Sequence, residues 1–205
     1  MRIGIDFDNT IAGYDRVFPK AAAEMGLLAG PCGGGKTAIR DALRRRPGGE
    51  DDWQRLQGQV YGRFMAEADL IAGVAPFLAT AKAAGAKVVI VSHKTQFGHA
   101  DPARIDLRDA ARAWMTARGF FDPVGFALSP GDVHFLPTRA EKIVRIAELA
   151  LDVFIDDLAE VFAEPGFPIT TRGLLFTNGE PAPKGPFESI SDWDAIAHAV
   201  FPAHA

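Results

Sequence analysis

The chain has 205 residues, of which 48% are hydrophobic and 23% charged, and its formal net charge at pH 7 is −4. This length suits one medium-sized domain or one domain with an insertion, and the mixed charges indicate neither a nucleic-acid polymer nor a membrane surface as partner. The single cysteine, Cys32, excludes a disulfide framework and a cysteine metal site, and no apolar run approaches the length of a membrane span.

The first predicted element is an apolar strand over residues 3–7, and because no signal-peptide pattern precedes it we expect a cytoplasmic protein. Asp6 and Asp8 stand two residues apart, and alternate side chains of a strand lie on the same side. Both carboxylates should therefore leave the C-terminal tip of the strand together, where open α/β sheets bind ligands. A divalent cation beside them would relieve their repulsion, whereas the simpler alternative is a capped strand–turn.

The following segment, residues 13–73, is predicted to be mainly helical. Helical spacing covers residues 16–29 and 38–72, with a break at residues 47–49. Trp53, Gln57 and Tyr61 recur every four residues and share one helix face, as do Lys36 and Arg40. Such a face can pack into a core, or it can form a surface that contacts substrate. The sequence leaves both interpretations open.

Between these helical stretches, residues 30–37 match the phosphate-binding loop pattern G-x-x-x-x-G-K-[ST]. That pattern carries its mechanism only between a buried strand and a helix, and the preceding residues are alanine-rich and helix-like. We therefore favour a helix–helix connection, with a P-loop kinase or NTPase that uses Lys36 and Thr37 as the rival interpretation.

The remainder of the chain alternates predicted strands and helices. Strands are predicted at residues 87–92, 124–128, 133–136, 152–157 and 174–176, and helices at 77–84, 106–118, 138–150, 158–163 and 193–200. Parallel strands joined by helices share one carboxyl edge. Ser92 and the Asp156–Asp157 pair end two of these strands, and Lys142 lies early on a helix, so all can converge with the first strand.

In chain order, these groups resemble the four motifs of the haloacid dehalogenase (HAD) superfamily. The matching residues are Asp6-Phe7-Asp8-Asn9-Thr10, Ser92, Lys142 and Asp156-Asp157. The resemblance covers residues 1–12 and about 74–180. It implies an α/β fold, a doubly wound parallel sheet formed by residues 1–12 and 74–205, with residues 13–73 inserted as a helical cap.

The resemblance also implies chemistry. Asp6 would be the nucleophile, Asp8 the general acid/base, and Ser92 and Lys142 the groups that bind the phosphoryl oxygens. Mg²⁺ is the implied cofactor, with the Asp6 carboxylate, the Asp8 backbone carbonyl and one or both of Asp156 and Asp157 as candidate ligands. An aspartate at position 8 favours phosphate-ester hydrolysis, or phosphoryl transfer as in the mutase branch, over dehalogenation.

The expected partner is a small-molecule phosphate ester. The candidate substrate contacts beyond Ser92 and Lys142 are His93, Lys94, Gln57, Tyr61, Lys36 and Arg40. A fainter resemblance to small HAD proteins linked to polysaccharide and sugar biosynthesis favours a sugar phosphate, and the Asp-Asp pair also resembles the deoxyribonucleotidase branch. A non-catalytic binding module on the same fold is the remaining alternative. The sequence specifies neither the ester nor the oligomeric state.

Overall fold

A computed structural model of the protein describes residues 1–28 and 35–202. Residues 30–34 of the phosphate-binding loop pattern, which include Cys32, lie outside these ranges. The chain divides into two compact units, one formed by Met1–Ala12, Leu70–Lys94 and Gly119–Ala205, the other by Gly13–Asp69 and Thr95–Arg118. Within the described residues, no helix is long and apolar enough to cross a membrane.

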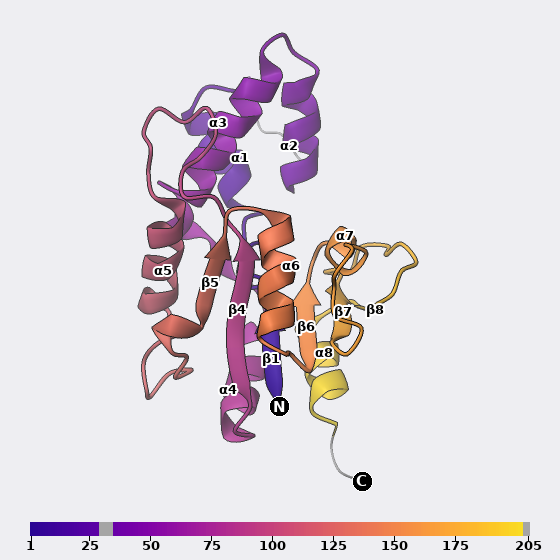
Figure 1. The fold of residues 1–205 in the computed structure, drawn as a ribbon. Coiled ribbons are helices and arrows are strands. Elements are labelled where there is room, and N and C mark those ends of the chain that lie inside the picture. The colour runs from indigo at the N-terminus through magenta and orange to yellow at the C-terminus, as the bar shows by residue number, and fades with distance from the viewer. Residues whose placement is uncertain (29–34, 203–205) are drawn as a thin grey trace. The chain divides into compact units, whose positions relative to one another are not determined.

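The first unit is built on a six-stranded sheet whose strand pairs are all parallel (Figure 1). The strands, in spatial order, are β5 (Val133–Leu136), β4 (Lys87–His93), β1 (Arg2–Ile5), β6 (Val153–Asp156), β7 (Arg172–Phe176) and β8 (Glu188–Ile190). Following the chain, β4 and β5 are added on one side of β1, and β6, β7 and β8 are then added on its other side. The strand order therefore reverses between β1 and β6, and ligands of doubly wound sheets bind beside such a switch point.

Helices cover both faces of this sheet, which confirms the predicted doubly wound α/β fold (Figure 1). They are α4 (Val74–Ala83), α6 (Arg139–Glu148), α7 (Ala159–Phe162) and α8 (Trp193–Val200), with a 3₁₀ turn, η2, at Pro130–Asp132. On one face, Val89 and Val91 of β4 and Phe154 of β6 pack with Ile143 and Ile146 of α6. Because alternate residues of a buried parallel strand serve opposite faces, β4 is apolar throughout.

On the opposite face, Trp193 of α8 lies against Phe77 of α4, with ring centroids 4.9 Å apart, and against Phe176 of β7. The Trp193 indole nitrogen also donates to the Thr10 carbonyl, 3.0 Å away, in the loop that follows β1. Gly73 has a φ of +85°, and a Cβ there would lie 2.5 Å from the Cβ of Trp193. Only glycine satisfies both requirements at this position.

The second unit is helical, as predicted for residues 13–73. It contains α1 (Val17–Glu24), α2 (Gly35–Arg44), α3 (Gly49–Tyr61), α5 (Leu107–Ala117) and the short 3₁₀ helix η1 (Met65–Glu67). Where the chain passes from one unit into the other, β2 (Ala12–Gly13) pairs with β3 (Asp69–Leu70) in a two-stranded sheet. The first of these helices ends at Glu24, shortly before Gly26, whose φ is +64°.

The division into units differs from the predicted one at residues 95–118, which the sequence placed with the sheet. Buried Asp101 accepts two 3.0 Å hydrogen bonds from the Gln59 side chain, and the Trp114 indole nitrogen donates to the Ala68 carbonyl at 2.9 Å. A Cβ on Gly98 would lie 2.6 Å from the Cα of Gly58, so the two backbones approach closely. These contacts attach the loop after β4, and α5 with it, to the helical unit.

Two other predictions about elements were wrong. Residues 124–128, predicted as a strand, form turns closed by backbone bonds from Phe126 to Gly119 and from Leu128 to Phe120. Within the segment Phe126 packs edge-on against Phe120 while Val124 is exposed, and the segment does not join the sheet. The helical spacing predicted over residues 38–72 corresponds to α2 and α3, with its break near residues 47–49, but the second helix ends at Tyr61, and a 3₁₀ turn and β3 follow.

Candidate active site

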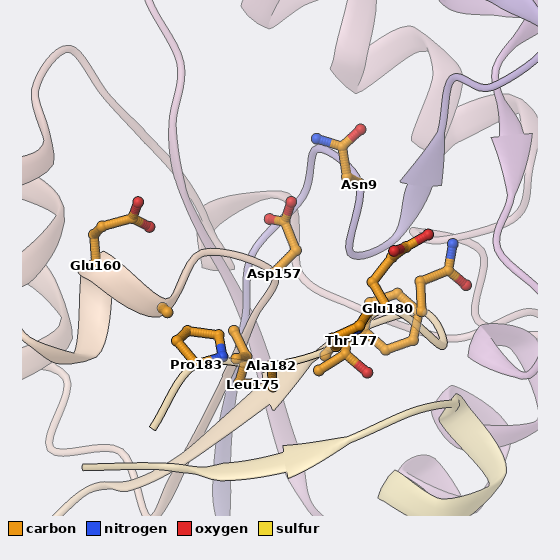
Figure 2. A pocket seen from close by; sticks show the side chains of 12 residues that line it. Asn9, Asp157, Glu160, Leu175, Thr177, Glu180, Ala182 and Pro183 are labelled. Carbon is orange, nitrogen blue, oxygen red and sulfur yellow. The ribbon is translucent and has the colours of Figure 1, made fainter. Parts of the chain in front are cut away.

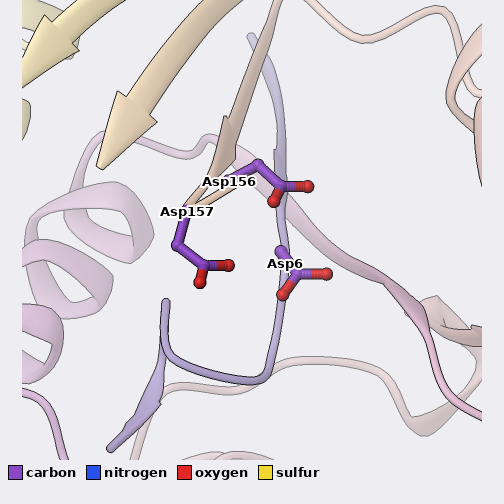
Figure 3. A group of neighbouring side chains, drawn as sticks. All are labelled: Asp6, Asp156 and Asp157. Carbon is purple, nitrogen blue, oxygen red and sulfur yellow. The ribbon is translucent and has the colours of Figure 1, made fainter. Parts of the chain in front are cut away.

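Three aspartates meet at the carboxyl edge of the sheet, at the switch point between β1 and β6 (Figure 3). Asp6 directly follows β1, Asp156 ends β6, and Asp157 follows it. One carboxylate oxygen from each lies within 4.8 Å of the other two. Asp156 is fully buried and Asp6 is 5% exposed. The parallel pairing of Ile5 with Ile155 explains this convergence, because it places the next residue of each strand at the same level.

Lys142 extends from α6 into this group. Its ammonium donates to Asp6 Oδ1 at 2.5 Å and to Asp156 Oδ2 at 2.6 Å, and the side chain is only 2% exposed. The helix begins with a full capping box between Thr138 and Glu141, the pairing that Thr-x-x-Glu makes at a helix start. Lys142 follows in the first turn, on the face that packs against the sheet, so the capping motif fixes where the ammonium enters the site.

The charges of this group are not balanced, because three carboxylates surround one ammonium. Burial raises the pKa of Asp6 to about 7; the charge and hydrogen bond of Lys142 oppose that rise, and the charges of Asp156 and Asp8 add to it. Burial lowers the pKa of Lys142, but the charges of Asp156 and Asp6 raise it above its usual value overall, so the ammonium stays protonated. Oxygen donors with surplus negative charge fit a divalent cation of the Mg²⁺ type.

Asp8 has a lysine partner of its own. Lys94, one residue beyond β4, donates to Asp8 Oδ2 at 2.8 Å and to Oδ1 at 3.1 Å. Its ammonium also lies 5.5 Å from the centre of the Phe7 ring. The structure brings Lys94 onto the candidate acid/base, and its predicted contact with substrate stays a prediction.

Ser92 and His93 end β4 beside these groups. Ile90 of β4 pairs with Ile5, so Ser92 lies at the same edge as Asp6, and its side chain is buried. The Nε2 of His93 lies 3.0 Å from the Pro137 carbonyl, and since a carbonyl only accepts, that nitrogen carries the proton of this bond. Burial lowers the pKa of His93, which favours the neutral ring. The structure thus places Ser92 at the site and engages His93 with backbone.

The loop after β1 is shaped by Asn9 and Thr10. Asn9 has a φ of +59°, a conformation that asparagine tolerates better than most residues, and its backbone N–H donates to the Ala12 carbonyl. The buried Thr10 hydroxyl lies 3.4 Å from Asp157 Oδ1. The turn thus brings Thr10, four residues after Asp6, back into contact with the acidic group.

A cavity of about 370 Å³ adjoins the acidic group on the β7 side (Figure 2). Asp157 and Asn9 line one end of it, and Thr177, Glu160 and Glu180 contribute further polar groups. Leu175, Phe176, Pro181 and Pro183 supply apolar surface. Among the described residues that line it there is no lysine or arginine. A site of this size and mixed polarity suits a small polar molecule.

The four candidate residues from the helical unit lie within it. Lys36 and Tyr61 come together, with the Lys36 ammonium 5.7 Å from the Tyr61 ring centre and 5.6 Å from that of Phe18. Arg40 donates to Asp41 at 2.9 Å, and Gln57 is half-buried on α3.

The neighbouring Trp53 stacks on Phe18 and is 3% exposed, so this end of the predicted face is core. Tyr61 packs edge-on against Tyr14, with ring centroids 4.9 Å apart, but stays half-buried. The predicted substrate contacts of Gln57 and Tyr61 stay predictions.

The P-loop alternative lacks its structural context. In the described part of the chain, the element before α2 is the helix α1, whereas a phosphate-binding loop connects a buried strand to a helix. Lys36 and Thr37 lie on the first turn of α2, after the helix that the alanine-rich sequence predicted.

Sequence reasoning missed several contributors. Glu160 on α7, and Thr177 and Glu180 after β7, line the cavity but carry no motif of their own. Trp193 supports the loop after β1 from a position 183 residues away in the chain, and nothing in the sequence relates the two. Lys94 was a candidate, but its partner could be found only once the strands were placed.

Several solved structures share this fold. A putative HAD hydrolase, YfnB of Bacillus subtilis, bound to magnesium, matches with a TM-score of 0.60 at 13% identity over 98% of each chain. A HAD-family hydrolase of Deinococcus radiodurans R1, with bound phosphate and sodium, matches with a TM-score of 0.57 at 17% identity over 97% of this chain and 94% of that one. Protein tyrosine kinase A of Mycobacterium tuberculosis matches with a TM-score of 0.63 at 14% identity over 98% and 97%.

No protein-family model matches the chain, and no curated protein matches it significantly by sequence. Identities this low establish the fold and not the activity, and the kinase among the matches makes the same point. The strand order and the four motif positions at one sheet edge agree with these matches. The chain therefore has the fold of the HAD-superfamily hydrolases.

Proposed function

We propose that the protein is a Mg²⁺-dependent phosphatase that hydrolyses a small-molecule phosphate ester through an aspartyl-phosphate on Asp6. The observation that carries the proposal is the group at the switch point: Asp6 in contact with buried Lys142, with Asp156 and Asp157 within 4.8 Å and Asp8 two residues on. Each of these side chains is of the type that the resemblance implies at its position, which supports the proposal. Residues 13–73 would form the cap that covers the chemistry.

In the first step, an Asp6 carboxylate oxygen would attack phosphorus as the bond from phosphorus to the leaving oxygen breaks, and Asp8 would give its proton to that oxygen. In the second step, Asp8 would take a proton from water as the water oxygen attacks phosphorus and the bond to Asp6 breaks. Ser92 and Lys142 would hold the phosphoryl oxygens throughout.

Mg²⁺ would be held by Asp6, Asp156 and Asp157, with the Asp8 backbone carbonyl as a further ligand. When bound, the ion lets an anionic carboxylate approach an anionic phosphate and offsets charge on the phosphoryl oxygens. The surplus of carboxylates over ammonium groups in this group supports the assignment. The magnesium and phosphate bound to the two similar hydrolases agree with it.

A sugar phosphate is the substrate class that we favour. The cavity beside Asp157 offers amide, hydroxyl and carboxylate groups over apolar surface, which suits a leaving group rich in hydroxyls. Glu160 and Glu180 have no ion-pair partner among the described residues, so they would repel a second phosphate or a carboxylate. This charge disfavours a bisphosphate and a phosphorylated acid.

The proposal is tested by measuring phosphate release from a panel of sugar phosphates, nucleotides and p-nitrophenyl phosphate, with Mg²⁺ and with EDTA. We expect Mg²⁺-dependent release that Asp6→Asn abolishes while the circular dichroism spectrum is kept. Rapid acid quenching should trap a phosphoryl group on the peptide that contains Asp6. Release that persists in folded Asp6→Asn, or in EDTA, would contradict the mechanism.

A further inference from the structure

Two lysines are the buried cations of the described sheet unit, and each contacts a different aspartate of the first motif. Lys142 contacts Asp6, and Lys94 contacts Asp8. Lys94 is 4% exposed, and its ammonium contacts the Asp8 carboxylate and the Phe7 ring in place of water. Burying an ammonium is costly unless it is paired, so this contact is part of the folded structure rather than an incidental surface pair.

Backbone holds Lys94 in register with its partner. Its N–H donates to the Leu136 carbonyl at 2.9 Å, which continues the β4–β5 pairing one residue past the end of β4. Asp8 is fixed from the other side by the turn that bonds Asn9 to Ala12 and Ala12 to Phe7. The ammonium reaches both oxygens of Asp8, at 2.8 and 3.1 Å, and so restrains rotation of the carboxylate.

We infer that Lys94 is a positioning residue that holds the Asp8 carboxylate in the orientation in which it transfers protons. The inference rests on the proposed function for its kinetic part and replaces the expectation that Lys94 binds substrate. Lys142 divides its contacts between Asp6 and Asp156, whereas Lys94 contacts both oxygens of Asp8, so the geometry ties Lys94 to that one carboxylate.

If Lys94 positions Asp8, its removal should have a kinetic signature that the removal of a substrate-binding lysine would not have. A general acid matters more when the leaving group is a poor one, so phenyl phosphate depends on Asp8 more than p-nitrophenyl phosphate does. If Lys94 acts through Asp8, its loss must show the same dependence. Loss of Lys94 should also cost nothing more once Asp8 has been disabled.

The experiment is a double-mutant cycle of Lys94→Met and Asp8→Asn, with Lys94→Arg as the conservative variant. Lys87→Met serves as matched control, because Lys87 also pairs with an aspartate, Asp132, but is solvent-exposed. We expect Lys94→Met to lower kcat for phenyl phosphate by about 10–10²-fold and to affect p-nitrophenyl phosphate less. KM and inhibition by inorganic phosphate should stay within about twofold, and Lys94→Arg should recover part of the loss.

The double variant should be no slower than Asp8→Asn alone. Losses that multiply, or a loss that lies mainly in KM and in phosphate inhibition, would overturn the inference and make Lys94 a substrate ligand. Urea denaturation of the wild type, the two single variants and the double variant supplies a readout that needs no turnover. Two residues in direct contact should change the free energy of unfolding non-additively. Additive changes in the free energy of unfolding would overturn the inference, whether or not the protein hydrolyses an ester. Absence of hydrolysis would count separately, against the proposed function.

Discussion

Replacing Lys142 with methionine should destabilise the protein strongly, because it removes the ammonium between two buried carboxylates. Asp6 and Asp156 would keep their burial and lose their shared donor, whose contacts are 2.5 and 2.6 Å long. Breaking a buried ion pair by removing one partner costs about 3–5 kcal/mol. Since a domain is stable by only about 5–15 kcal/mol, the loss should be a large part of the free energy of unfolding.

The defect should depend on pH in a definite direction. Burial raises the pKa of Asp6 from 3.8 to about 7, so between these values the folded protein holds a proton that the unfolded chain releases. The contribution of this group to stability therefore falls as pH rises through that window. Without the Lys142 ammonium the carboxylate resists ionisation further, and Lys142→Met should be more severely destabilised at about pH 8 than at about pH 5.

Magnesium should restore part of the loss. A cation that binds only the folded protein adds about 2.7 kcal/mol of stability when its concentration is about 100 times its dissociation constant. The measurement is urea denaturation followed by tryptophan fluorescence, in EDTA and in Mg²⁺, at both pH values. The control Lys87→Met breaks an exposed pair and should cost at most about 1 kcal/mol at either pH. Equal losses in the two variants, or no response of Lys142→Met to Mg²⁺, would refute this account of the site.

Four further predictions concern activity. Asp8→Asn should lower kcat by about 10²–10⁴-fold and leave Mg²⁺ affinity nearly unchanged in a metal titration, because only the Asp8 backbone is a candidate ligand. Gln57→Ala and Tyr61→Phe should raise KM for the physiological ester far more than KM for p-nitrophenyl phosphate; equal effects would mean that they serve only the fold. Lys36→Ala should keep p-nitrophenyl phosphatase activity, whereas loss of that activity together with ATP binding by the wild type would favour the P-loop alternative. Glu180→Lys should improve kcat/KM for 6-phosphogluconate relative to glucose 6-phosphate, and an unchanged ratio would remove the cavity from the leaving-group site.

The centre of the site was predictable because topology alone brings it together. Asp6 and Asp156 end apolar strands, and parallel strands joined by helices leave such ends at one edge. Lys142 was predictable because a capping box fixes the start of its helix. These features need only local patterns and general rules of chain connection.

The misses arose where tertiary contacts outweigh local pattern. The sequence predicts no element between the strand that ends at residue 92 and the helix that starts at residue 106, and the contact of buried Asp101 with Gln59 attaches this loop to the helical unit. The strand β8 is only three residues long, Glu188–Ile190, and its sequence has no apolar run. The pairing of Lys94 with Asp8 spans 86 residues of sequence and depends on the end of β4, which no periodicity specifies.

The bond from Trp193 to the Thr10 carbonyl has a consequence for the order of folding. The strand β1 is synthesised before the other strands of its sheet, yet it lies inside the sheet, and its loop is supported by α8, which follows all of them. Contacts between such distant residues form slowly, since a long stretch of chain must first be closed. During synthesis the loop that carries Asp8 would therefore lack its support until α8 has emerged. Chains that stop before Trp193 should retain the first motif but fail to hold its loop in the final shape.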